Sequence, residues 1–169
     1  TIMTYFTLAG CAALLFRLEL IAPGATIMGA QFYNVLMTFH GAGMIFLFIV
    51  PGIPATLGNI VLPLMIGAKD VAFPRINLAS YYVFLVGSLI ALISLFSPAD
   101  TGWTFYTPYS MKSDSLVIWM TTGAFIMGFA SIMTGFNFLV TVHRMRAPGL
   151  TWNKLPIFVW TLYATAILQ

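Results

Sequence analysis

Residues 38–75 read TFHGAGMIFLFIVPGIPATLGNIVLPLMIGAKDVAFPR, and this long apolar run decides the fold class. It exceeds the roughly 20 residues that a helix needs to cross about 30 Å of hydrocarbon. Prolines inside it each remove a backbone donor, so we expect kinks within one membrane helix at Pro51, Pro54 and Pro63. The few polar residues of the run are His40, Asn59, Lys69, Asp70 and Arg75.

The composition of the whole chain agrees with a membrane protein. Of its 169 residues 60% are hydrophobic and 7% charged, whereas water-soluble domains carry about 25% charged residues. The net charge of +3 rests on seven Lys and Arg residues in short loops, which indicates membrane orientation and makes nucleic acid an unlikely partner. Cys11 is the single cysteine, so neither a disulfide framework nor a thiolate metal cluster is expected.

Apolar runs separated by Pro, Gly and charged residues predict an all-α, polytopic transmembrane helix bundle, in which residues 1–169 form a single transmembrane region. The start of the chain shows neither an initiator Met nor a basic signal segment, and its last apolar run is shorter than a span. We therefore expect part of a longer subunit, with the first and last helices incomplete. The expected helices cover residues 1–18, 33–66, 77–96, 115–141 and 156–169.

The loop charges predict an orientation. Five of the seven Lys and Arg residues fall in loops 67–77 and 143–155, so the positive-inside rule assigns these loops to the cytoplasmic or equivalent inner side. Asp70 then lies on the inner side, and His40 lies close to the outer side.

The two histidines have different contexts. A histidine inside a span could simply hydrogen-bond a neighbouring helix, but burying an ionisable group is costly and favours a functional role for His40. Imidazole is a usual axial ligand of haem iron, and the following Gly-Ala-Gly leaves little bulk beside it. His143 begins the sequence HRMR where its helix leaves the membrane, which is typical of an interfacial residue, and we assign it no ligand role.

Membrane amides suggest a second feature. Asn59, Asn77 and Asn137 could each make an ordinary interhelical hydrogen bond. Together with hydroxyls such as that of Ser131 they could also hold a file of water, for which Asp70 would collect protons. The alternative for Asp70 is a loop acid paired with a neighbouring cation, a surface pair of small energetic value.

Two further stretches carry open alternatives. Arg17 and Glu19, at the end of the first helix, could form an interfacial pair whose charged groups reach water, or Arg17 could hydrogen-bond a polar edge of a buried cofactor. Trp103, in an aromatic loop, could belong to the interfacial aromatic belt.

Several blocks together resemble the catalytic subunit I of haem-copper terminal oxidases. The resemblance covers essentially the whole chain and implies part of that family's twelve-helix fold. The blocks are FRLELIAPG (16–24), FYNVLMTFHGAGMIF (32–46), GNIVLPLMIGAKDVAFPRIN (58–77), DTGWTFYTPYS (100–110), SIMTGFNFLVTVHRMRAPGLTW (131–152) and LPIFVWTLYATAIL (155–168).

The resemblance also implies roles for individual residues. His40 stands where the family places an axial ligand of the low-spin haem, of a or b type, and Arg17 stands where an arginine meets a polar edge of that haem. Trp103 stands close to the haem propionates. Asp70 stands at the entrance of a proton pathway, and the amides beyond it order water.

In this family the opposite haem ligand, the proximal ligand of the high-spin haem and the histidines of the copper centre lie beyond the fifth helix, so this stretch alone is not expected to be active. The implied activity of the whole subunit is proton-pumping reduction of O2 to water with electrons from cytochrome c, or alternatively from a ubiquinol or menaquinol. Its implied partners are oxidase subunits II and III and membrane lipid. The bacterial cytoplasmic membrane is the expected location, with the inner mitochondrial membrane as the alternative.

Two rival classes are a proton-coupled transporter and a b-type electron carrier. In a transporter, Asp70 and the amides would line a substrate path, and no iron or visible absorption is expected. A b-type carrier needs two facing histidines within the bundle, and His143 lies at the wrong end of its helix for that role.

Overall fold

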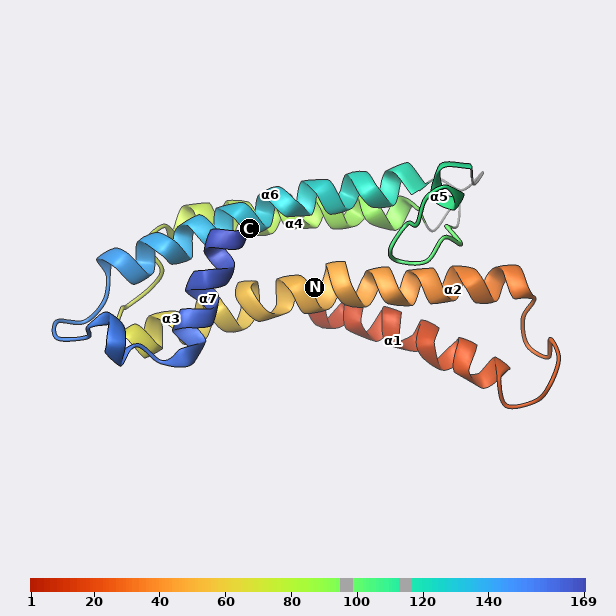
Figure 1. Cartoon of the computed structure of the whole chain (residues 1–169), viewed down its shortest axis with the longest axis horizontal. Helices are drawn as coiled ribbons and strands as arrows, with labels where there is room; N and C mark the ends of the chain where they lie inside the picture. The colour runs from red at the N-terminus through yellow and green to blue at the C-terminus, as the bar shows by residue number, and fades with distance from the viewer. Residues whose placement is uncertain (95–98, 113–116) are drawn as a thin grey trace. The chain divides into compact units, whose positions relative to one another are not determined.

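The structure, a computed structural model, describes residues 1–94, 99–112 and 117–169, and every regular element in these ranges is helical (Figure 1). The predicted all-α class is thus confirmed. The elements in chain order are α1 (Ile2–Glu19), α2 (Ala30–Ala42), η1 (Gly43–Ile49), η2 (Gly52–Gly58), α3 (Asn59–Ile66), α4 (Pro74–Ile93), α5 (Tyr109–Lys112), α6 (Val117–Arg144), η3 (Trp152–Lys154) and α7 (Ile157–Leu168).

Within residues 1–94, 99–112 and 117–169, four helices are long and apolar enough to cross a membrane, which supports an integral membrane protein. They match the first four predicted helices to within a few residues at the described ends. The predicted end at residue 96 and the predicted start at residue 115 lie outside the described residues. The four spans are Ile2–Glu19, Ala30–Ile66, Pro74–Ile93 and Val117–Arg144.

The stretch 30–66 is one continuous helix whose hydrogen-bond pattern changes along its length. It starts as α2, widens into the π-helical segments η1 and η2, and returns to α-helix in α3. Pro51 immediately precedes η2 and Pro54 lies within it, where each removes an N–H from the ladder. The wider π-helical turns are therefore the form in which the expected proline disturbance occurs around Pro51 and Pro54.

The ends of the helices follow local chemistry. Gly67 ends α3 with a left-handed φ of 75°, and the Ala68 N–H donates to the carbonyl of Pro63 at 2.8 Å. This positive φ favours glycine because a side chain would be strained there. Pro74 opens α4, at a position where no intrahelical N–H is needed.

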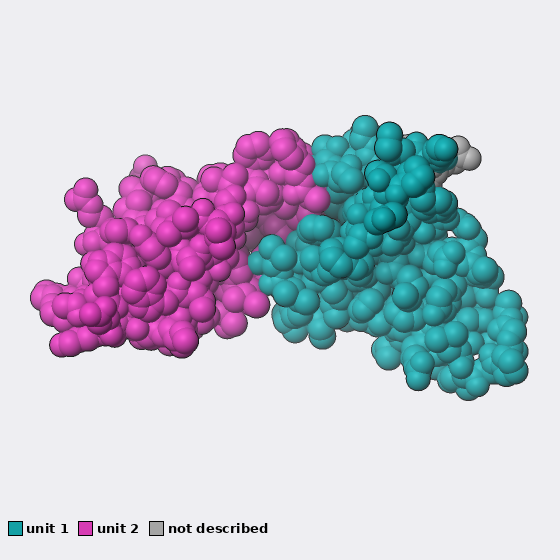
Figure 2. All heavy atoms as spheres, viewed as in Figure 1, with its two compact units in different colours: residues 1–50, 89–123 teal, residues 51–88, 124–169 magenta. Residues whose placement is uncertain are grey.

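The chain divides into two compact units, shown in Figure 2. Unit 1 comprises residues 1–50 and 89–123, and unit 2 comprises residues 51–88 and 124–169. In unit 1, small side chains let α1 approach the stretch after α2 closely, since a Cβ added to Gly43 would lie 3.1 Å from the Cβ of Ala9. The core of unit 2 consists of Leu62, Ile66, Val71, Phe138, Val142, Leu155, Val159 and Leu162.

Two short elements were not among the predicted helices. The four residues of α5 and the three residues of η3 lie in stretches read as loops. Neither is long enough to show a hydrophobic period, which explains why pattern reasoning places no helix there.

Candidate functional site

His40 lies near the end of α2, where unit 1 packs α2 against α1. Its Nδ1 lies 2.9 Å from the carbonyl oxygen of Ala9 on α1. A carbonyl can only accept, so Nδ1 carries the proton of this hydrogen bond, and in the neutral ring the lone pair is then on Nε2. The ring also meets Phe16 edge-on at 5.6 Å between centroids. The imidazole is therefore held in one orientation by its neighbours on α1.

This geometry fits a haem ligand. Metal-bound histidines usually donate their other ring N–H to a carbonyl or carboxylate, which sets the tautomer and the orientation of the ring. The residues that follow His40 are small, and other side chains pack closely on them, Trp103 on Gly41 and Ala9 on Gly43. Among the described residues no three His, Cys, Asp or Glu side chains gather to hold a metal ion.

Trp103 packs directly on the residue that follows His40. A Cβ added to Gly41 would lie 3.0 Å from Cδ1 and 3.1 Å from Cβ of Trp103. The backbone beside the indole is also fixed, because the Gly102 N–H donates to Oγ1 of Thr38 at 2.9 Å. Trp103 itself is 45% exposed. The structure thus places Trp103 against Gly41, the residue that follows His40.

A second contact ties the same loop to the beginning of α2. Asp100 Oδ2 accepts hydrogen bonds from the Tyr109 hydroxyl and from Nε2 of Gln31, both at 2.8 Å. The Tyr109 bond and then the Gln31 bond hold the pKa of Asp100 below its usual value, and the same carboxylate raises the pKa of Tyr109. The cluster therefore persists above the usual Asp pKa, and it weakens when the pH falls through the lowered Asp100 pKa or rises through the raised Tyr109 pKa.

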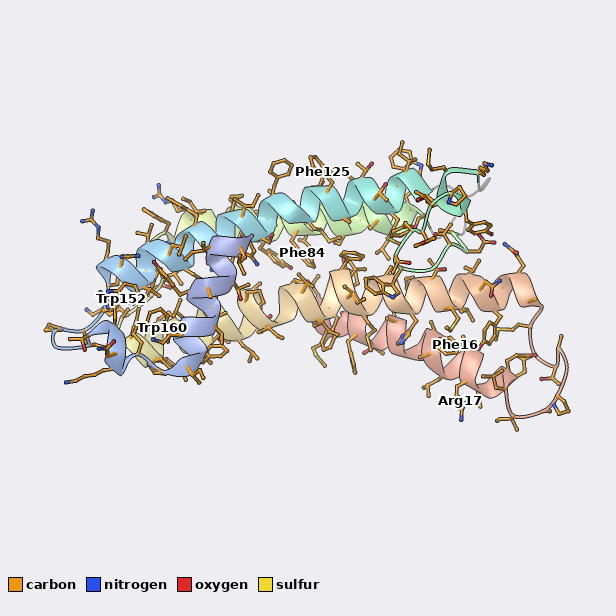
Figure 3. All side chains as sticks on the ribbon, in the orientation of Figure 1. Phe16, Arg17, Phe84, Phe125, Trp152 and Trp160 are labelled. Atoms are coloured by element: carbon orange, nitrogen blue, oxygen red, sulfur yellow. The ribbon has the colours of Figure 1, made fainter. Side chains whose placement is uncertain are left out.

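Arg17 and Glu19 do not behave as the expected interfacial pair. Glu19 is only 6% exposed, and its carboxylate accepts the backbone N–H groups of Thr26, Ile27 and Met28 at 2.7, 2.7 and 2.9 Å. The Glu19 carboxylate binds the backbone of the loop between α1 and α2, so the interpretation in which its charge reaches water is wrong. Arg17 is exposed, and Figure 3 shows it on the side of α1 away from α2, whereas Phe16 faces α2. The structure therefore does not bring Arg17 to His40.

In unit 2 the loop that carries Asp70 is bound to α6. The Asn137 side chain pairs with the backbone of Phe73, since Oδ1 accepts its N–H at 2.9 Å and Nδ2 donates to its carbonyl at 3.3 Å. One turn further, Thr141 Oγ1 accepts the Ala72 N–H at 2.9 Å. Asn137 and Thr141 are both 0% exposed. Asp70 itself is exposed, and its Oδ1 accepts the N–H of Val71 at 2.7 Å.

The remaining amides and hydroxyls have different partners. Nδ2 of Asn59 donates to the Ala55 carbonyl at 2.7 Å, while its Oδ1 is buried with no hydrogen-bond partner in the described structure. A buried acceptor without a protein donor is typical of a site that binds ordered water. Asn77 is half-buried, and its backbone carbonyl accepts the Ser80 hydroxyl. Ser131 donates to the carbonyl of Gly128 at 2.8 Å on its own helix.

His143 occupies the end of α6, as the sequence indicates, but it is not isolated there. Its Nε2 lies 2.8 Å from the hydroxyl of Tyr163, and its ring meets that of Trp152 at 5.1 Å between centroids. These contacts belong to unit 2, whereas His40 belongs to unit 1.

Sequence reasoning missed several residues that organise these sites. They are Gln31, Asp100, Tyr109 and Thr141. The Gln31–Asp100 and Ala72–Thr141 contacts each join residues 69 positions apart in the chain, whereas Asp100 and Tyr109 are 9 apart. One signal for these contacts is present in the sequence. Gln31, Thr38 and Gly41 are spaced by seven and then three residues, which places them on one face of α2.

Comparison with known proteins identifies the family of the chain. The family described as Cytochrome C and Quinol oxidase polypeptide I matches residues 1–169. The chain is 41% identical over 99% of its length to Probable cytochrome c oxidase subunit 1-alpha of Streptomyces avermitilis, covering 30% of that protein. It is 37% identical over 99% of its length to cytochrome c oxidase subunit 1 of Thermostichus vulcanus, covering 31%, and 38% identical over 97% to that of Bacillus subtilis, covering 27%.

The chain therefore spans about 30% of the length of the curated relatives it matches. The match extends over all the elements described above, from α1 to α7, and it disfavours the transporter and the b-type carrier. The chain belongs to the family of cytochrome c and quinol oxidase polypeptide I, the haem-copper oxidase subunit I.

Proposed function

We propose that this chain is part of the catalytic subunit of a proton-pumping cytochrome c oxidase, in which His40 provides one axial ligand of the low-spin haem. A haem in this position supplies one-electron transfer toward the haem-copper centre that reduces O2 to water, and the ligands of that centre would lie outside this chain. The relatives described above are named cytochrome c oxidases, which favours cytochrome c as the electron donor over a quinol.

The observation that carries this proposal is the hydrogen bond between His40 Nδ1 and the Ala9 carbonyl. It fixes the tautomer whose Nε2 can bind iron. Trp103, which packs on Gly41, would lie close to the propionates. For Arg17 to hydrogen-bond a polar edge of the haem, either its side chain would turn toward α2 or a haem substituent would extend to it.

The second part of the proposal concerns protons. Asp70 would collect them from the inner side, and Asn59, Asn77, Asn137 and Ser131 would guide ordered water beyond it. The orphaned Oδ1 of Asn59 supports a water site. Asn137 would hold the Asp70 loop as well, because both polar atoms of its amide bind Phe73.

The location and partners of the whole subunit follow from the same family. We propose a bacterial cytoplasmic membrane, since the relatives described above are bacterial, with subunits II and III as neighbours. Loops 67–77 and 143–155 would face the cytoplasm.

The test of the haem assignment is His40→Ala in the complete subunit. We expect the low-spin haem absorption to disappear, because iron loses one axial ligand. His143→Ala is the matched control, since His143 is the other histidine of the chain and lies in unit 2. Retention of the low-spin spectrum in His40→Ala would refute the assignment.

The test of the proton entrance is Asp70→Asn, which removes the titratable group and nearly preserves its shape. We expect slower turnover and slower proton uptake by reconstituted vesicles, with the haem spectrum unchanged. Asp70→Glu should recover part of the rate because it restores a carboxylate. Wild-type turnover in Asp70→Asn would show that protons enter elsewhere.

A further inference from the structure

Unit 2 gathers positive charge at the end that contains the C-terminus of α6. The loops 67–77 and 143–155 contain five Lys and Arg residues and one carboxylate, Asp70. Backbone contacts hold the two loops together, since the Ala147 N–H donates to the Ile66 carbonyl at 2.9 Å, and a Cβ added to Gly67 would lie 3.0 Å from that of Ala147. We call Lys69, Arg75, Arg144, Arg146 and Lys154 the basic cluster.

Arg146 is the member of this cluster that the fold positions most firmly. Its guanidinium carbon lies 4.2 Å from the ring centroid of Trp152, a cation–π arrangement. Its Nη1 is buried and has no hydrogen-bond partner in the described structure. A guanidinium donor without an acceptor is costly, so this group favours an anion that can accept from it after a small side-chain movement.

Trp152, on which Arg146 packs, belongs to an aromatic cluster with Trp160 and Tyr163. Trp152 meets Trp160 at 5.4 Å and Tyr163 at 5.1 Å between centroids, and the Trp160 indole N–H donates to the Trp152 carbonyl at 3.2 Å. Figure 3 shows Trp152 and Trp160 at the end of unit 2 that contains η3 and the start of α7. Tryptophan and tyrosine are typical of the level where the hydrocarbon meets the headgroups.

Helix length places the cluster at the same level. The 28 residues of α6 extend about 42 Å at 1.5 Å per residue, whereas the hydrocarbon is about 30 Å thick. Arg144 and Arg146, at and just beyond the end of α6, can therefore reach the phosphates. Large apolar side chains remain exposed nearby on α7, including Ile157 at 83% and Trp160 at 41%.

We infer that Arg146, Arg144 and Lys154, with Trp152 and Trp160, bind the phosphate headgroup of an anionic phospholipid whose acyl chains lie along α7. The cations and the buried guanidinium donor would bind the phosphate, and the exposed apolar residues beside them would contact the acyl chains. An acidic protein segment would use the cations but not the apolar face. This inference does not depend on the proposed redox function.

The experiment measures lipid binding to the complete, purified oxidase. The protein is delipidated in detergent and titrated with phosphatidylglycerol or with phosphatidylcholine, and the bound lipid is counted by native mass spectrometry. Arg146→Gln and Lys154→Gln are the test variants, and Lys112→Gln, an exposed lysine on α5 outside the cluster, is the matched control. A haem absorption spectrum verifies that each variant is folded.

We expect preferential binding of phosphatidylglycerol, weakened about fivefold for each cation removed and unchanged in Lys112→Gln. Arg146→Lys should weaken binding less than Arg146→Gln because it keeps the charge. Equal retention of the two lipids, or equal loss in Lys112→Gln, would overturn the inference. Complete displacement of the lipid by excess inorganic phosphate would also overturn the inference. The same holds if Arg146→Gln released a neighbouring subunit while the count of bound lipid stayed unchanged.

Discussion

Gly41 illustrates how a single residue can fix the position of a functional side chain. A Cβ at position 41 would lie only 3.0 Å from the nearest atom of the Trp103 indole, which is closer than an ordinary van der Waals contact. Glycine is needed here for close approach rather than for an unusual backbone angle, because Gly41 lies within the regular helix α2. Its importance is thus steric and comes entirely from a partner 62 positions later in the chain.

We expect Gly41→Ala to push Trp103 off α2 and to lower the thermal midpoint of the protein. Overpacking of this kind costs about 1–3 kcal/mol, which outweighs the gain of about 1 kcal/mol from better helix propensity. Gly10→Ala on α1 is the control, because a Cβ there meets nothing within 4 Å, and it should leave the midpoint unchanged or raise it. The check is thermal unfolding followed by circular dichroism, and an unchanged midpoint in Gly41→Ala would show that the Trp103 contact is loose.

The polar residues show where reasoning from a single sequence reaches its limit. His40 stands out because an ionisable group is rare in an apolar run, and its partner, the Ala9 carbonyl, is a backbone atom that no residue type reveals. Glu19 has the same kind of partner, three backbone N–H groups, and so a charged residue at a helix end was wrongly expected to face water. Side chains that bind backbone atoms leave no pattern in the sequence.

At the scale of elements, composition and hydropathy suffice for the long helices because a membrane span needs an apolar run of known length. They do not reveal how the helix 30–66 accommodates its prolines. Pro51 and Pro54 are visible in the sequence, but the choice between a kink and a π-helical turn depends on which carbonyls find new donors. The loop 67–73 was likewise recognised by its charges, whereas its attachment to α6 was not.

That attachment can be tested at Thr141, whose hydroxyl accepts the Ala72 N–H. We expect Thr141→Val to destabilise the protein by about 1–3 kcal/mol, because the buried N–H loses its acceptor while the side chain keeps its shape. Hydrogen exchange at Ala72 and Phe73 should become faster.

Thr121→Val is the control on the same helix. Thr121 is exposed, and its hydroxyl donates to the carbonyls of Val117 and Ile118 on its own helix. This variant should leave exchange in the 67–73 loop unaltered. If Thr141→Val also left that exchange unaltered, then Asn137 alone would be holding the loop.

At the scale of the whole molecule, the two units are joined by the spans 30–66, 74–93 and 117–144, each of which continues from one unit into the other. Unit 1 contains His40 and Trp103, and unit 2 contains Asp70 and the basic cluster. The proposed electron and proton functions therefore fall on different units. The loop charges predict the inner side for loops 67–77 and 143–155 and the outer side for the loop that carries Lys112.

This orientation can be tested by cysteine labelling in the complete subunit, with Cys11→Ser in a background free of other reactive cysteines. Met111→Cys, on α5, probes the proposed outer side, and Asn153→Cys, on η3, probes the proposed inner side; both positions are exposed. The positive-inside rule predicts that a membrane-impermeant maleimide labels residue 111 from outside intact cells and residue 153 only in inverted vesicles. The reverse pattern would place Asp70 on the side opposite to the proposed proton supply, and the proton-entrance role of Asp70 would then be untenable even if His40 still bound haem.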